Sequence, residues 1–125
     1  MANGWSASDY VIPGTVTGVV SNQPISKEFP ITARGALNCV FKITVAGVTN
    51  VGTQTLKLQT AIGSDWVDSK STTFTADGAY YIKLQTTLAG DQTYLPLLNK
   101  GRIVLTQTNA GDIATVSKVE VVQEL

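Results

Sequence analysis

Hydrophobic and polar residues alternate along most of this chain with the period of two that is typical of β-strands. The clearest run covers residues 53–62, where Leu56, Leu58, Thr60 and Ile62 fall on one face and mostly polar residues fall on the other. A helix would scatter these four side chains around its axis, because its period is 3.6. The pattern therefore predicts a strand with one buried face.

Turn-forming residues separate the alternating runs. Gly63-Ser64-Asp65 follows the first run and precedes Trp66-Val67, which predicts a hairpin with a three-residue connection. A second hairpin is expected where residues 72–75 lead through Ala76-Asp77-Gly78 into a return strand over residues 79–88. Asp-Gly favours this turn because glycine accepts a positive φ without a steric cost.

Short strands recur along the rest of the chain. They are expected over residues 25–33, 37–45, 102–107 and 115–123. Short strands with turn signals at intervals of roughly ten residues are typical of sandwiches and barrels. We therefore predict an all-β fold, an antiparallel β-sandwich of about eight strands that is either jelly-roll-like or Ig-like.

Two segments do not follow the strand pattern, and both are apolar. Residues 1–22 are predicted to form an extended N-terminal arm or an edge strand, ahead of a sandwich domain over residues 23–125. Residues 90–100 form either a loop that caps the core or a contact surface. Trp is enriched among interface anchors. The candidate interface residues in these segments are Trp5, Tyr10, Val11, Ile12, Tyr94, Leu95 and Leu97.

Length and charge narrow the class of protein. The 125 residues fit one domain. Nine basic residues balance nine acidic ones without a basic cluster, which argues against binding to nucleic acid or to anionic lipid. No run of 18 apolar residues predicts a membrane span, and the N-terminus lacks the pattern of a secretory signal, so synthesis without export is expected. The low net charge favours self-association, and we expect a homo-oligomer.

The residue inventory excludes most catalytic and metal sites. The chain has no histidine and a single cysteine, Cys39, so it lacks the groups for a conventional catalytic triad or a zinc site. No glycine-rich nucleotide-binding motif occurs. Asp77 and Asp112 each lie beside a glycine and could each offer calcium one ligand, but neither has a second carboxylate at ligand spacing. We predict a protein without enzymatic activity, metal or cofactor.

The sequence Asp65-Trp66-Val67-Asp68 is the one remaining candidate for sugar chemistry. Two carboxylates are enough for glycoside hydrolysis, and a tryptophan beside them could stack on a sugar ring. In a hairpin, however, Asp65 is a good turn former, Trp66 is expected to pack into the core, and Asp68 is expected on the face opposite Trp66. A structural turn is the preferred interpretation. A carbohydrate-binding or receptor-binding module and a glycosidase fragment are the rivals.

Residues 56–84, LKLQTAIGSDWVDSKSTTFTADGAYYIKL, resemble a pattern common in structural proteins of tailed bacteriophages. In that pattern an apolar strand ends in a Gly/Ser/Asp turn and a Trp, and a Thr-rich strand and a Phe-Thr-Ala-x-Gly-x-Tyr turn follow. The resemblance implies a virion subunit similar to capsid decoration or cement proteins, which often bind as trimers and bridge major capsid subunits, commonly through an N-terminal arm. A tail or head-completion role is the alternative.

Overall fold

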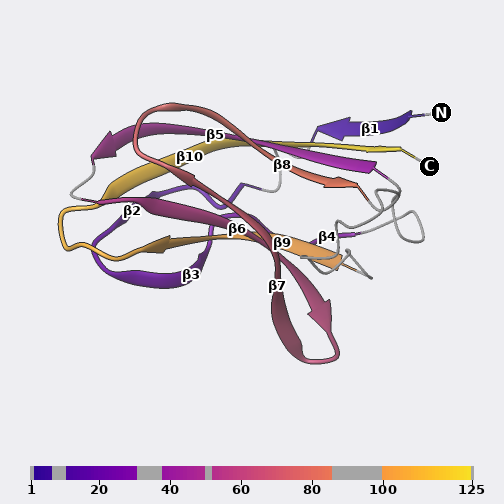
Figure 1. Cartoon of the computed structure of the whole chain (residues 1–125), viewed down its shortest axis with the longest axis horizontal. Coiled ribbons are helices and arrows are strands. Elements are labelled where there is room, and N and C mark those ends of the chain that lie inside the picture. Colours follow the sequence, from indigo (N-terminus) through magenta and orange to yellow (C-terminus); the bar gives the residue numbers. More distant parts are fainter. Residues whose placement is uncertain (1, 7–10, 31–37, 50–51, 86–99, 125) are drawn as a thin grey trace.

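The protein is a two-layered β-structure in a computed structural model that describes residues 2–6, 11–30, 38–49, 52–85 and 100–124 (Figure 1). One sheet contains β1 (Ala2–Ser6), β2 (Thr15–Thr17), β5 (Asn38–Thr49), β8 (Gly78–Gln85) and β10 (Ile113–Glu124). The other contains β3 (Val20–Pro24), β4 (Phe29–Pro30), β6 (Gln54–Ile62), β7 (Asp65–Phe74) and β9 (Lys100–Gln107). The predicted all-β sandwich is confirmed. Within the described residues no helix is long and apolar enough to cross a membrane.

Each sheet has four strand positions, although the described residues form ten strands. In the first sheet the order is β1-β10-β5-β8, and β2 pairs with β10 along the same edge as β1. In the second sheet the order is β3-β9-β6-β7, and β4 pairs with β9 along the same edge as β3. Four positions in each sheet give eight in all, which agrees with the predicted number.

The strand pairing follows a jelly roll. The first position (β1 and β2) pairs with the last strand β10, the second (β3 and β4) with β9, β5 with β8, and β6 with β7, all antiparallel. This is one long antiparallel ribbon wound into two sheets. Among the described strands, β6–β7 is therefore the only connection between two different strand positions that stays within a sheet. Of the two predicted architectures, the jelly roll is therefore the one the chain adopts.

The predicted second hairpin is wrong. β7 and β8 lie in different sheets, and residues 75–77 carry the chain from one layer to the other. Asp-Gly turn chemistry reverses the chain direction but does not determine which strand becomes the hydrogen-bonded partner. At this crossing the Asp77 carboxylate accepts hydrogen bonds from the backbone amides of Gly47 (3.2 Å) and Val48 (2.7 Å) in β5.

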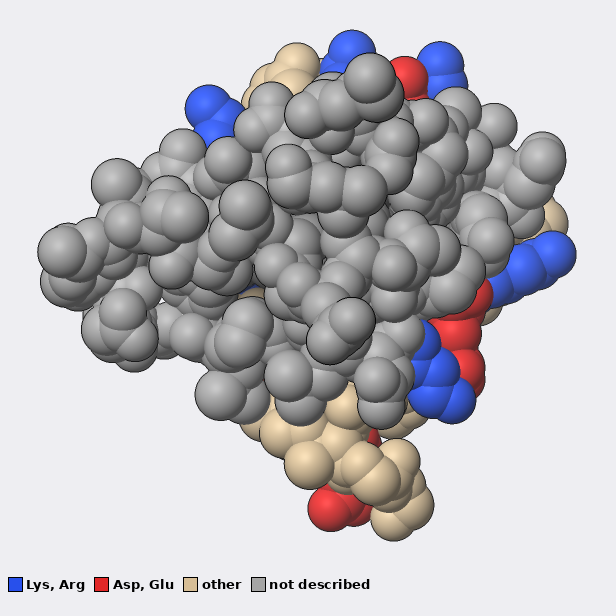
Figure 2. All heavy atoms as spheres, turned by 90° about the vertical axis from the view of Figure 1, so that its right-hand side faces the viewer, with Lys and Arg blue, Asp and Glu red and all other residues tan. Residues whose placement is uncertain are grey.

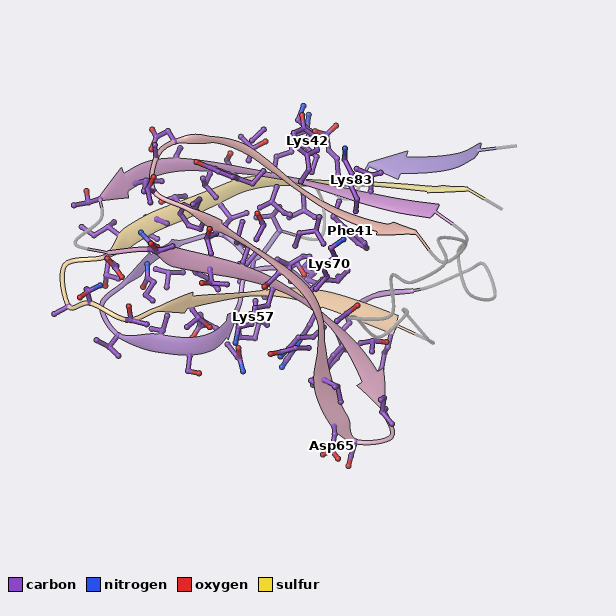
Figure 3. All side chains as sticks on the ribbon, viewed as in Figure 1. Phe41, Lys42, Lys57, Asp65, Lys70 and Lys83 are labelled. Carbon is purple, nitrogen blue, oxygen red and sulfur yellow. The ribbon has the colours of Figure 1, made fainter. Side chains whose placement is uncertain are left out.

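The β6–β7 hairpin is shorter at its turn than predicted and projects from the sandwich. Ile62 pairs with Asp65, which leaves two turn residues, and Gly63 takes φ 63°. A glycine with positive φ at the first turn position matches the right-handed twist of the strands. Asp65 lies at the projecting tip (Figure 3), and Figure 2 shows the hairpin as a protrusion below the body of the molecule.

The core lies between the two sheets and follows the alternation of the strands. Phe41 is fully buried there, between the layers (Figure 3). Leu56 and Leu58 are also fully buried, as predicted, whereas Ile62 is 44% exposed because it lies near the projecting end of the hairpin. The remaining buried cluster consists of Ile25, Ile43, Val45, Phe74, Ile82, Ile103, Leu105, Ala114, Val116 and Val119.

The described residues of the segment 1–22 lie along sheet edges. β1 pairs with residues 120–124 of β10, and β2 with residues 113–115. Val11 forms an isolated bridge with Ser26 and packs against the core, and the Ile12 amide donates to the Ile25 carbonyl at 3.0 Å.

Candidate binding site

A row of polar side chains crosses the outer face of the β3-β9-β6-β7 sheet. Arg102 of β9 pairs in register with Gln59 of β6, and Gln59 pairs with Asp68 of β7. Cross-strand partners point to the same side of a sheet. Leu58, the neighbour of Gln59, is buried in the core, so the row lies on the side that faces away from the other sheet.

A β-bulge in β7 creates this row. Leu58 pairs with Lys70, but Gln59 pairs with Asp68, so β7 has one more residue than β6 at this point, which is Ser69. In the unbroken alternation set by the buried Phe74, the even-numbered residues of β7 would all point inward. The bulge shifts the inward–outward alternation by one residue, so the even-numbered residues that precede it, Trp66 and Asp68, point outward.

Two predictions about this hairpin are wrong. Trp66 was expected in the core, but it lies on the outer face, where the guanidinium carbon of Arg102 stands 4.4 Å from the centre of its ring. Asp68 was expected on the face opposite Trp66, but residues two apart in a strand share a face, and both belong to the outer row. The tryptophan is half-buried and forms a cation–π pair.

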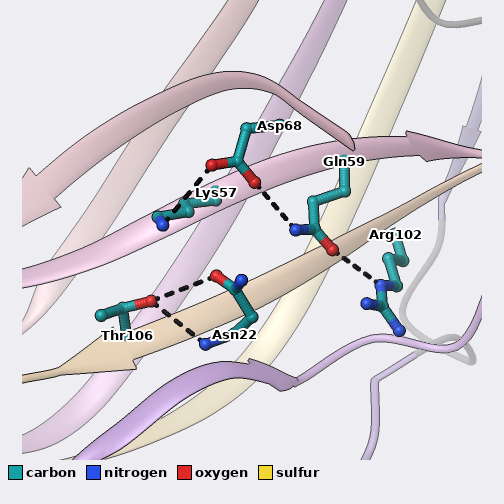
Figure 4. A network of polar contacts seen from close by, with 6 residues as sticks. All are labelled: Asn22, Lys57, Gln59, Asp68, Arg102 and Thr106. Carbon is teal, nitrogen blue, oxygen red and sulfur yellow. Dashed lines mark hydrogen bonds and ion pairs between the residues drawn. The ribbon is translucent and has the colours of Figure 1, made fainter. Parts of the chain in front are cut away.

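Hydrogen bonds connect the row into a chain of polar contacts (Figure 4). Arg102 Nε donates to Gln59 Oε1 at 2.9 Å, and Gln59 Nε2 donates to Asp68 Oδ1 at 2.8 Å. The other Asp68 oxygen lies 3.5 Å from Lys57 Nζ. Gln59 is only 2% exposed although it lies on an outer face, so the surrounding side chains cover it. Both Oε1 and Nε2 of the Gln59 amide form hydrogen bonds, and these bonds fix the positions of Arg102 and Asp68.

A second polar contact continues the outer face onto β3. Asn22 donates its backbone amide to Thr106 Oγ1 at 3.2 Å, and the Thr106 hydroxyl donates to Asn22 Oδ1 at 3.4 Å (Figure 4). Asn22 has φ 52°, a left-handed conformation that asparagine tolerates better than most residues. Val104, which lies between Arg102 and Thr106 along β9, is fully buried. The outer face therefore also contains a covered apolar position.

Two opposing effects act on the pKa of Arg102. Partial burial lowers the pKa of its guanidinium through desolvation, and the nearby Glu28 carboxylate offsets only part of this lowering. Glu28 itself pairs with Lys100 at 3.0 Å. Within the described part of the chain, the Nη atoms of Arg102 have no hydrogen-bond partner. They are held in place by the contacts at Nε and at the Trp66 ring, and they remain free to donate to a ligand.

The carboxylates proposed for hydrolysis or calcium do not converge in the described residues. Asp68 is engaged by Gln59 and Lys57, and Asp65 occupies the hairpin tip. Asp112 is buried and accepts hydrogen bonds from the backbone amides of Thr108 (3.2 Å) and Asn109 (3.1 Å), so it organises the β9–β10 turn. No group of three or more Cys, Asp or Glu suited to a metal ion occurs among these residues.

The predicted interface residues are only partly described. The backbone of Trp5 pairs with Val121 at the edge of the first sheet. Val11 packs against the core of its own chain, and Ile12 is 38% exposed. Tyr10, Tyr94, Leu95 and Leu97 lie outside the described residues. The Trp66–Arg102 pair was missed as a surface feature, because no sequence signal marks the bulge at Ser69.

Comparison with known proteins gives a likeness of overall architecture only. No protein-family model and no curated protein matches the sequence. The chain is similar to the CBM36-1 domain of a multidomain xylanase from the hindgut metagenome of Trinervitermes trinervoides, with a TM-score of 0.46 and 13% identity over 97% of this chain and 96% of that one. It is also similar to PirA, with a TM-score of 0.38 and 16% identity over 94% and 92%.

Proposed function

We propose that this protein is a non-enzymatic structural protein of a tailed-phage virion, and specifically a decoration or cement protein that binds the assembled head. The observation that supports a non-catalytic role most directly is how the carboxylates are used. Asp77 and Asp112 hold backbone amides, and Asp68 holds Gln59 and Lys57. Side chains that could carry chemistry are thus used to stabilise turns and strands.

The assignment to a virion rests on the sequence pattern over residues 56–84 and on the type of fold. Jelly rolls occur in viral capsid proteins and in lectin domains, among others. The proposed partner is the major capsid protein or another virion protein, with a trimer as the expected oligomer and the virion, after synthesis in the host cytoplasm, as the location.

The proposed mechanism is mechanical. A subunit that binds the assembled shell but not free capsid protein shifts the equilibrium towards the shell by mass action. No bond is made or broken in this process. A tail or head-completion role uses the same principle on a different lattice, and the two are separated by testing which purified particle retains the protein.

Strand β1 gives a test of the predicted arm. We would remove residues 2–6 and compare retention of this variant and of the full chain on purified particles after sedimentation. A deletion reaching Ile12 would be harder to interpret, because it also removes Val11, which packs against the core. Lower retention of the short variant, with an unchanged unfolding midpoint, supports a contact through the arm. Equal retention removes the arm from the mechanism.

A further inference from the structure

We propose that the outer face around Trp66 binds a neutral sugar ring. The face consists of Trp66, Arg102, Gln59, Asp68 and Lys57, and we call it the Trp66 face. This inference is independent of the proposed role in a virion. It concerns a ligand in solution or on a cell surface, and it uses residues that the predicted interface does not include.

The aromatic component is the half-buried Trp66. The electron-rich face of an indole ring attracts the partly positive C–H groups on the apolar face of a sugar. Arg102 lies over the ring at 4.4 Å and fixes its orientation. Trp66 is partly exposed, and because Arg102 occupies one face of the ring, the sugar in this proposal stacks on the opposite face.

The hydrogen-bonding component lies beside the ring. The Nη atoms of Arg102 offer donors in a planar fork, and in the described residues none of them is used. Asp68 keeps spare acceptor capacity on a side chain that is 54% exposed. A fork of donors on one side of Gln59 and a carboxylate on the other suit the hydroxyl groups of one sugar, because each hydroxyl both donates and accepts. An aromatic surface with a few placed polar groups is the usual composition of a ligand site.

The charges favour a neutral ligand over an acidic one. Lys57 lies 3.5 Å from Asp68, and Lys100 lies 3.0 Å from Glu28, which also acts on Arg102. Basic and acidic side chains lie next to each other at the rim of the molecule in Figure 2. No uncompensated positive field is therefore available to attract a nucleic acid or an acidic peptide. A sugar without charge binds by stacking and hydroxyl contacts alone.

The site is organised before any ligand arrives. Gln59 is buried and holds Arg102 on one side and Asp68 on the other, at 2.9 and 2.8 Å. Side chains that are already fixed lose less conformational entropy on binding. A strand framework also places them more rigidly than a loop would. The Trp66 face therefore has the fixed geometry that a specific sugar site needs.

The test is titration of the full chain with neutral oligosaccharides. We would use tetrasaccharides of glucose, xylose and N-acetylglucosamine at millimolar concentration in a Trp5→Phe background, where tryptophan emission reports only on Trp66. An acidic peptide serves as the competing ligand. We expect a saturable change in emission with at least one sugar. Trp66→Ala and Arg102→Lys should each lower the affinity for the sugar about tenfold, which corresponds to about 1.4 kcal/mol. Binding to Trp66→Ala, which lacks the reporting tryptophan, is measured by calorimetry.

The control is Tyr81→Ala, which removes a 50% exposed aromatic residue from the other sheet and should leave sugar affinity unchanged. Unfolding midpoints of all variants show whether they are folded. No response to any of the sugars, or equal affinity in Trp66→Ala and the parent chain, would overturn the proposal. Binding of the acidic peptide in place of the sugars would overturn it as well and would make the Trp66 face a protein contact.

Discussion

Replacing Gln59 with methionine removes both hydrogen bonds at the centre of the polar row and keeps a side chain of similar length and volume. Both bonds involve a charged partner, and such bonds contribute about 1.5–3 kcal/mol each when their partners are left without water. The Asp68 side chain is 54% exposed and is hydrated again after the substitution, so losing the Gln59–Asp68 hydrogen bond costs well below that range. Arg102 is half-buried and regains less hydration, so losing the Arg102–Gln59 hydrogen bond costs more. We therefore expect a loss of about 2 kcal/mol in the free energy of unfolding.

Urea unfolding followed by circular dichroism measures this loss. With a slope of about 2 kcal/mol per molar urea, the midpoint should fall by about 1 M. Gln23→Met is the matched control, because Gln23 lies on β3 with an exposed side chain, and its midpoint should stay within error of the parent. If Gln59→Met and Gln23→Met unfold at the same urea concentration, the row does not stabilise the sheet and the argument for a fixed Trp66 face fails.

Three further substitutions test other parts of the structure by the same unfolding assay. Phe41→Ala should cost about 3–5 kcal/mol because it opens a cavity at a fully buried position, and a loss under 1 kcal/mol would contradict the described core. Gly63→Ala should cost about 1–2 kcal/mol from backbone strain alone, since its φ is 63° and no atom lies within 4 Å of an added Cβ. Lys42→Ala should change stability by less than about 0.5 kcal/mol, because its 4.0 Å ion pair with Glu120 is exposed to solvent, and a larger loss would mean that this pair is part of a stronger network.

The strand content and the core followed from the sequence because both are local. Alternation alone placed Leu56 and Leu58 in the core, and turn residues marked most strand ends. The partner of each strand is a long-range property, and this is why the hairpin expected between residues 72–75 and 79–88 proved to be a crossing between sheets. Turn chemistry is compatible with either outcome.

The candidate site could not be predicted, because it depends on a bulge at Ser69 that the hydrophobic pattern of the sequence does not indicate. The bulge at Ser69 reverses the phase of β7, so that Trp66 faces outward beside Arg102 rather than into the core. A bulge forms where the pairing of both strands accommodates an extra residue, and a single strand does not reveal it. The contacts of Arg102 with Gln59 and Trp66 join residues 43 and 36 positions apart in sequence (102 − 59 and 102 − 66), which spacing cannot predict.

The central claim is that this protein acts by binding an assembled lattice. The most direct measurement is sedimentation of the purified chain with assembled phage heads and, separately, with unassembled major capsid protein at the same subunit concentration. We expect saturable binding to the heads, release of the protein when the heads are dissociated, and no complex with free subunits. Equal binding to heads and to free subunits, or no binding to either, would contradict it.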